Sequence, residues 1–132
     1  MKFFLLDTNA CIQYLRGRNP VLTARVRACK PRQVCLCSIV VGELYYGAYH
    51  SPLPTANLQA VDQLVGMFAC LPFDAAREFG SIRATLAAAG TLIGSYDMQI
   101  AAIARVNQFT LVTHNVGEFA RVAGLVVEDW QV

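Results

Sequence analysis

Four acidic side chains in this sequence stand where a ligand site could form. Asp7 comes directly after an apolar run at residues 3–6, and Glu43 lies in a segment that is apolar nearly all round. Asp97 heads one apolar face of a predicted helix, and Glu118 follows a predicted strand. Taken singly, each has an ordinary explanation, because Asp7 and Asp97 could cap helices while Glu43 and Glu118 could be solvated.

Taken together, the four acids predict a site for a hard divalent cation. Carboxylates that converge without a cation repel one another, and oxygen ligands without Cys or His at ligand spacing favour Mg²⁺ or Mn²⁺ over zinc. Asn115 could supply only a neutral carbonyl oxygen, so we expect Glu118 to complete the set, with Gly117 at positive φ turning it back toward the strand edge. Such ions suit phosphodiester hydrolysis, in which they activate water and stabilise the leaving oxygen.

The basic residues are concentrated near the N-terminus. Residues 1–32 hold seven basic groups and one acid, a net +6, whereas the rest of the chain holds four basic groups and eight acids, a net −4. A basic lobe beside an acidic site suits a polyanion such as RNA, although a solvated helix face would look the same. The candidate substrate contacts are Thr8, Asn9, Asn115, Arg16 and Arg18. His114 lies beside them, and an ordinary loop histidine is its simpler interpretation.

Composition and absent motifs exclude other classes. The chain has 132 residues, of which 55% are hydrophobic and 15% charged, which fits one folded domain over residues 1–132. No phosphate-binding glycine loop and no nucleophile-elbow motif occurs. Five cysteines without metal-ligand spacing are expected to be reduced core residues. The sequence shows neither a secretion signal nor a run long enough to span a membrane, so we expect a cytoplasmic protein.

Apolar and polar periodicity predicts alternating strands and helices. The expected strands are residues 3–6, 33–37, 70–72, 109–112 and 125–127. The expected helices are a short one ending at Gly17, then 20–29, 39–49, 55–68, one from the Phe73-Asp74 cap to 89, and 96–107, with Ser38 and Gly94-Ser95 as further caps. This order predicts a three-layer α/β fold with a mostly parallel sheet, whose ligand crevice lies beyond the carboxyl ends of the strands.

Five segments carry a family resemblance. They are FLLDTN at 4–9, VGELYYGA at 41–48, GTLIGSYDMQIA at 90–101, LVTHNVGEF at 111–119 and VEDW at 127–130. In this order, they resemble the PIN-domain ribonucleases, specifically the VapC toxins of bacterial VapBC toxin–antitoxin pairs. The resemblance implies a metal-dependent endoribonuclease acting on tRNA or rRNA, with Asp7, Glu43 and Asp97 as metal-binding acids. Many relatives carry an aspartate where this chain has Asn115.

The resemblance also implies partners. We expect a cognate VapB-type antitoxin and a homodimer, which would cover apolar surface in excess of what the core needs. Two other functions stay open at this point. One is a module that binds RNA or a protein through structural acids, and the other is a Mg²⁺-dependent receiver-like or phosphatase-like domain. The second would need an acid paired with Asp7 or a lysine on the closing strands, and no lysine follows Lys30.

Overall fold

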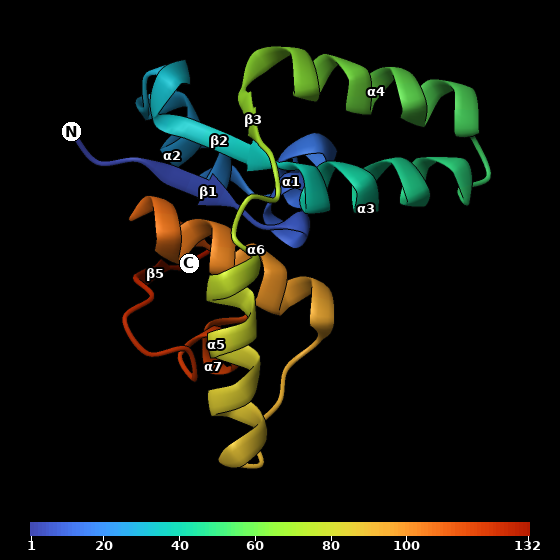
Figure 1. Cartoon of the computed structure of the whole chain (residues 1–132). Helices are drawn as coiled ribbons and strands as arrows, with labels where there is room; N and C mark the ends of the chain where they lie inside the picture. The colour runs from blue at the N-terminus through green and yellow to red at the C-terminus, as the bar shows by residue number, and fades with distance from the viewer.

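The computed structural model describes residues 1–132 and contains one five-stranded sheet (Figure 1). Its spatial order is β3-β2-β1-β4-β5, and every pairing between neighbours is parallel, as the sequence predicts. The strands are β1 (Phe4–Leu6), β2 (Val34–Cys37), β3 (Ala69–Leu71), β4 (Thr110–Val112) and β5 (Val127–Glu128). The first strand of the chain therefore lies at the centre of the sheet.

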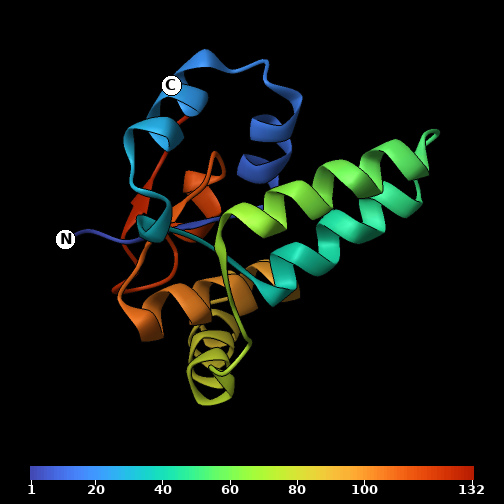
Figure 2. The same cartoon turned by 90° about the horizontal axis from the view of Figure 1, so that it is seen from above.

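Helices connect the strands and cover both faces of the sheet. They are α1 (Thr8–Arg16), α2 (Pro20–Ala28), α3 (Ser38–Tyr49), α4 (Pro54–Met67), α5 (Ala76–Ala88), α6 (Ser95–Asn107) and α7 (Val116–Phe119), with a 3₁₀ turn at Pro31–Gln33. Figure 2 shows α1 and α2 on one side of the sheet, α5 and α6 on the other, and the α3–α4 hairpin extending away from both. This is the three-layer α/β architecture expected from the sequence. No helix is both long and apolar enough to cross a membrane.

The core fills the space on both sides of the central strands. All three residues of β1 are buried, as are all residues of β2 and β4, because helices cover both faces of a parallel sheet. Trp130 is 1% exposed and packs edge-on against Phe4, with their ring centroids 4.8 Å apart. That contact fixes the segment after β5 against the centre of the sheet.

Several element ends differ from the sequence-based expectation. Ser38 is the first residue of α3 and not its cap, because the chain passes directly from β2 into the helix. The Phe73-Asp74 pair does not cap α5, whose N-cap is Ala75. Gly17 ends α1 as expected, in the left-handed region at φ 64°, where its N–H donates to the last carbonyls of the helix.

The segment after β4 differs most from expectation. Residues 116–119 form the short helix α7, which the sequence did not predict, and Gly117 lies within it and not at positive φ. The last strand is Val127–Glu128, two residues shorter at its start than expected and one longer at its end. Of the five cysteines, Cys29 is only half-buried and Cys70 is exposed on the edge strand β3, so the expectation of five core cysteines is wrong for these two.

Candidate active site

Asp7 lies at the carboxyl end of the central strand and is only 6% exposed. Its Oδ1 accepts a hydrogen bond of 2.8 Å from the backbone N–H of Ala10, so it does cap α1. Burial raises the pKa of Asp7, hydrogen bonds from Thr113 and Ala10 oppose that rise, and the negative charges of Glu43 and Asp129 add to it. The helix cap and the shared charge are thus two properties of one side chain.

Asp97 stands in the first turn of α6 and belongs to the same group of charges. Its pKa is raised to about 6, first by burial and then by the charges of Glu118, Glu43 and Asp7, in that order. The helix begins after Gly94 without a side-chain cap, and Asp97 accepts no capping hydrogen bond. The four predicted acids therefore share one electrostatic environment, although they come from four different parts of the chain.

Glu43 is held by a neighbour from another helix. The Thr8 hydroxyl in the first turn of α1 donates a hydrogen bond of 2.7 Å to Glu43 Oε1, which is presented by α3. Since Asp7 precedes Thr8 in the chain, this bond joins the carboxyl end of β1 to α3. It leaves the second oxygen of Glu43 without a hydrogen-bond partner in the protein.

No basic side chain neutralises the four acids. The ion pairs of the structure join Lys2 and Arg25 to Glu128, Arg105 to Glu78, and His114 to Asp129. The donors at the site are oxygens of acidic side chains, which suit a hard divalent cation. In this conformation, however, no three His, Cys, Asp or Glu side chains are grouped closely enough to hold a metal ion. The donor chemistry thus fits a metal, whereas an ion would have to draw the side chains together.

Glu118 and Asn115 occupy different positions around these acids. Glu118 lies in α7, and among the neighbouring charges it contributes most to the raised pKa of Asp97. The backbone N–H of Asn115 donates to the Thr113 hydroxyl at 2.9 Å, while its exposed side chain makes no hydrogen bond within the protein. Glu118 reaches the site from a helix, so the positive φ expected at Gly117 is not what brings it there.

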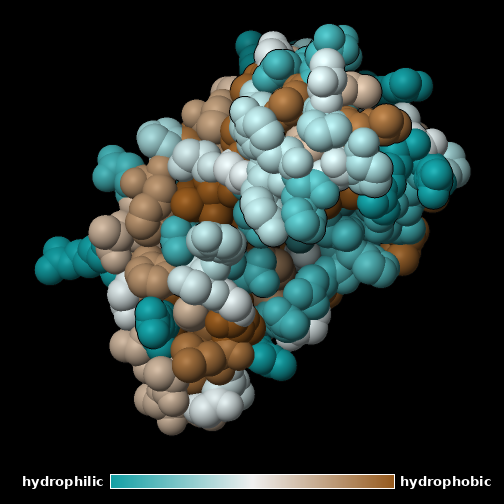
Figure 3. All heavy atoms as spheres, turned by 90° about the vertical axis from the view of Figure 1, so that its right-hand side faces the viewer, coloured by the Kyte–Doolittle hydropathy of each residue, from teal (hydrophilic) through white to brown (hydrophobic).

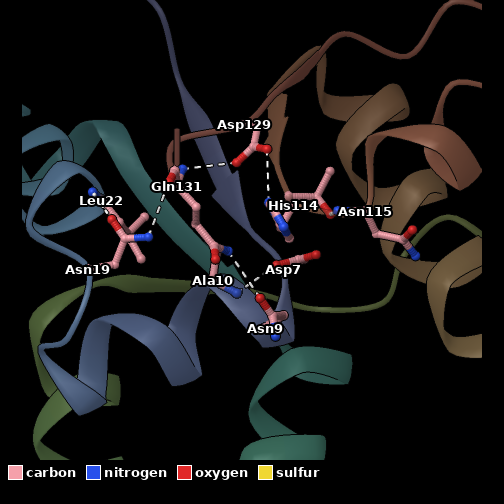
Figure 4. A network of polar contacts seen from close by, with 10 residues as sticks. Asp7, Asn9, Ala10, Asn19, Leu22, His114, Asn115, Asp129 and Gln131 are labelled. Carbon is pink, nitrogen blue, oxygen red and sulfur yellow. Dashed lines mark hydrogen bonds and ion pairs between the residues drawn. The ribbon is translucent and has the colours of Figure 1, made fainter.

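Sequence reasoning missed one acid beside the site. Asp129 follows β5 directly, and its charge contributes to the raised pKa of Asp7. Its Oδ2 pairs with His114 Nδ1 at 2.9 Å, and Figure 4 shows both side chains next to Asp7. The rule that polar residues at carboxyl ends of parallel strands converge applies to Asp129 as it does to Asp7, and could have found it.

Two cavities open beside Glu43. One, of about 630 Å³, is lined by Thr8, Ser38, Ile39, Gly42, Glu43, Tyr46 and Tyr96. The other, of about 310 Å³, runs between α1, α3 and α4 and has Arg16 and Glu43 in its wall. Arg16 is thereby brought near the acids, whereas Arg18 is exposed and makes no hydrogen bond or ion pair. Asn9 lies at the rim, where its Oδ1 accepts from Gln131 Nε2 at 3.0 Å.

Known proteins resemble the chain over nearly its full length. The profile of the family described as the PIN domain matches residues 4–125. The "tRNA(fMet)-specific endonuclease VapC" of Shigella flexneri is 38% identical over 129 residues, which cover 96% of this chain and 97% of that protein. "Ribonuclease VapC2" of Haemophilus influenzae (strain ATCC 51907 / DSM 11121 / KW20 / Rd) is 36% identical over the same shares of both chains.

Solved structures show the same fold. DNA-bound VapBC from Salmonella typhimurium contains a chain that matches with a TM-score of 0.92 at 38% identity, covering 98% of this chain and 99% of that one. VapBC2 from Rickettsia felis, bound to a DNA fragment from their promoter, matches with a TM-score of 0.91 at 29% identity, covering 97% and 98%.

Proposed function

The chain belongs to the PIN-domain family, as a VapC ribonuclease of the toxin–antitoxin kind, and we propose that it cuts RNA internally at the acid cluster with the help of Mg²⁺ or Mn²⁺. The observation that carries this proposal is the convergence of Asp7, Glu43, Asp97 and Glu118 in one environment without a basic partner. Membership in a ribonuclease family favours this function over a receiver-like domain or a module with structural acids.

The side chains divide the work at the site. Asp7 and Asp97, both with raised pKa values, would hold a cation together with Glu43 and Glu118. A bound cation supplies an activated water and stabilisation of the leaving oxygen. Thr8 orients Glu43, and the Ala10 N–H fixes one oxygen of Asp7 so that the other faces the site. Attack by water at phosphorus leaves a 3′-hydroxyl and a 5′-phosphate.

The cavity beside Glu43 supports unpaired RNA as the substrate. Tyr46 and Tyr96 line it and are 67% and 59% exposed, and Tyr46 stacks on the ring of His50. Exposed aromatic faces bind splayed bases of single-stranded RNA by stacking. Because the Shigella flexneri relative is named for tRNA(fMet), we infer that a loop of tRNA is the substrate, with rRNA as the second candidate.

We infer that a VapB-type antitoxin and a second copy of the chain cover apolar surface. The matching structures from Salmonella typhimurium and Rickettsia felis are VapBC complexes. Large apolar side chains such as Leu53, Met67 and Leu92 are at least half exposed. Figure 3 shows the face toward which the α3–α4 hairpin projects, where hydrophobic patches alternate with hydrophilic ones. Exposed patches of this kind mark surfaces that bind other proteins.

A cleavage assay with mapped ends tests the proposed function. Purified protein should cut tRNA with Mg²⁺ or Mn²⁺, leave 5′-phosphate ends and stop when a chelator is added. Asp7→Asn should abolish cutting, whereas Asp74→Asn should not, because Asp74 is an exposed acid without hydrogen bonds or ion pairs. Cutting that persists in chelator, or in Asp7→Asn, would contradict the proposal.

A further inference from the structure

We propose that His114 Nε2 accepts a hydrogen bond from a ribose 2′-hydroxyl of the bound RNA and so helps the site to distinguish RNA from DNA. This inference rests on the proposed function, since it requires RNA at the acid cluster. His114 is not a cation ligand in this proposal. It is a contact to the sugar, and Asp129 is the residue that positions it.

Asp129 determines which nitrogen of the ring carries the proton. Its Oδ2 lies 2.9 Å from His114 Nδ1, and its Oδ1 accepts from the backbone N–H of Gln131 at 2.9 Å. An ionised carboxylate can only accept hydrogen bonds, so Nδ1 must be the donor. In a neutral imidazole the other nitrogen, Nε2, is then an acceptor. Nε2 makes no hydrogen bond within the protein, and the His114 side chain is 58% exposed against 17% for Asp129.

Asp129 itself is anchored by the residue that follows it. The Trp130 indole is buried, donates from its N–H to Glu128 Oε1 at 3.0 Å and packs against Phe4. Successive side chains of an extended segment point to opposite sides, so Asp129 and Gln131 face away from the core. Gln131 in turn bonds to Asn9, and Figure 4 shows this chain of contacts running along the rim of the site. The imidazole is thus held by a support that is itself fixed to the sheet.

The position of His114 places its free nitrogen next to the reacting groups. It lies between Thr113, whose hydroxyl bonds to Asp7 and lowers the pKa of that carboxyl, and Asn115. Figure 4 shows the His114 ring beside Asp7, with Asp129 on one side and Asn115 on the other. A nucleotide whose phosphate reaches the acids therefore has its sugar within the neighbourhood of this ring.

The chemistry of the RNA backbone identifies the matching group. Phosphate oxygens accept hydrogen bonds, and the 2′-hydroxyl is the one donor that the sugar–phosphate backbone repeats at every nucleotide. DNA lacks it. A neutral acceptor at the rim consequently has a partner in RNA and none in DNA. The Asn115 amide is a comparable acceptor, but no hydrogen bond fixes its orientation.

Two substitutions of similar size separate the two ring nitrogens. His114→Asn keeps a donor where Nδ1 stands and removes the atom that replaces Nε2, whereas His114→Gln keeps an acceptor near Nε2 and loses the contact to Asp129. The exposed ring makes both variants compatible with folding. They are compared on one oligoribonucleotide and on the same molecule with a single 2′-deoxy or 2′-fluoro nucleotide next to the cleaved bond. Assays at about pH 8 favour neutral imidazole.

We expect the 2′-deoxy and 2′-fluoro substrates to lower kcat/KM of the wild-type protein by about tenfold, because neither can donate. His114→Asn should lose about the same factor on all-ribose RNA and show no further loss on the deoxy substrate. His114→Gln should retain part of the discrimination. A deoxy penalty that is unchanged in His114→Asn, or full activity on the 2′-fluoro substrate, would overturn the proposal.

Failure of the proposed function looks different from failure of this inference. Absence of cleavage by the wild-type protein, or cleavage that leaves 2′,3′-cyclic phosphate and needs no metal, would contradict the proposed function. A readout without RNA tests the support alone: the ¹⁵N chemical shifts of His114 should show a proton on Nδ1, and Asp129→Ala should release the ring to a mixture of tautomers. His50, the other histidine, serves as the control, and an Nε2–H tautomer in the wild-type protein would contradict the inference.

Discussion

The hydroxyl of Thr8 donates a hydrogen bond of 2.7 Å to Glu43, and so ties the first turn of α1 to α3 across the acid cluster. The two residues are 35 positions apart in the chain, and no secondary-structure hydrogen bond connects their helices. The geometry of the site therefore depends on one neutral side chain whose hydroxyl can be removed by substitution.

Thr8→Val should lower kcat by about tenfold, because it removes the hydroxyl and keeps the shape, so that Glu43 loses its orientation. Thr8→Ser is the matched control and should keep most of the activity. Thermal unfolding of both variants measures any general damage to the fold. Equal activity of Thr8→Val and wild type would show that Glu43 is oriented by other means.

Metal-free protein should lose stability as the pH rises from about 4 to about 6. The pKa of Asp97 is raised from 3.8 to about 6, so the folded chain binds this proton more tightly than the unfolded chain does. Ionisation then favours unfolding, and the loss persists at neutral pH. Asp97→Asn should remove this slope and stabilise the protein at neutral pH by about 1 kcal/mol, or about 4 °C in Tm, a value reduced for partial exposure.

Melting curves across this pH range, recorded with chelator for wild type and Asp97→Asn, provide the measurement. Asp74→Asn, which alters an exposed acid, should leave the slope in place. An Asp97→Asn slope identical to the wild-type slope would mean that Asp97 does not carry the shared charge.

Glu118→Gln should raise the Mg²⁺ or Mn²⁺ concentration needed for half-maximal cleavage far more than Asn115→Ala does. Glu118 acts on Asp97 through its charge, and a hard dication prefers a carboxylate to a neutral amide. Some cleavage should remain at high metal concentration, because Asp7 and Asp97 are unchanged. Calorimetric titration with Mn²⁺ gives the same comparison without RNA, and the reverse order of the two variants would assign the ligand role to Asn115.

Neutralising Arg16 and Arg18 together should weaken RNA binding about tenfold and reduce the salt slope by about 1. Arg16 supports this expectation because it lines a cavity with Glu43. The control is Arg77→Gln with Arg83→Gln, which alters two exposed arginines of α5. Binding is measured with Asp7→Asn protein at several salt concentrations, so that the RNA stays intact. Equal slopes in both pairs would return Arg16 and Arg18 to a solvated helix face.

Arg25 is unsuitable for such a test, although the charge pattern groups it with the other arginines. Its guanidinium pairs with Glu128 and lies 5.1 Å from the centre of the Trp130 ring. A substitution there would loosen the segment that carries Asp129, and the loss of binding would have two causes.

Tyr46→Ala should raise KM for tRNA about tenfold with a smaller effect on kcat, since the loss of one stacking surface weakens binding by about 1–3 kcal/mol. Tyr46→Phe keeps the ring and should bind normally, which separates stacking from hydrogen bonding by the hydroxyl. Because Tyr46 is 67% exposed, stability should change little. Unaltered KM in Tyr46→Ala would place the bases elsewhere.

The sequence predicts the sheet and the acids well because both follow from simple rules. Apolar runs at Phe4–Leu6 and Val34–Cys37 become buried parallel strands, and the strand-end rule directs attention to Asp7. Glu118 was also identified, but for a wrong reason, since α7 and not a turn at Gly117 presents it. A four-residue helix is too short to leave a periodic signal.

Other features depend on contacts between distant residues and could not be read locally. Asp129 looks like part of a polar tail until Trp130 is seen to lie against Phe4. The partner of Thr8 is likewise invisible in sequence, because nothing in the segment around Thr8 indicates that α3 passes beside it. His114 was assigned an ordinary loop position for the same reason.

The order of the strands also sets when the site can exist during synthesis. β1 lies between β2 and β4, with Leu6 opposite Val112, so the first strand made waits for one of the last. A nascent chain that ends before Thr110 contains Asp7, Glu43 and Asp97 but lacks β4, the neighbour that brings Thr113 to Asp7. Ribosomes add about 5–20 residues per second. Translation therefore imposes a delay of seconds between the appearance of the first acid and the assembly of a complete site, and prematurely terminated products lack that assembly altogether.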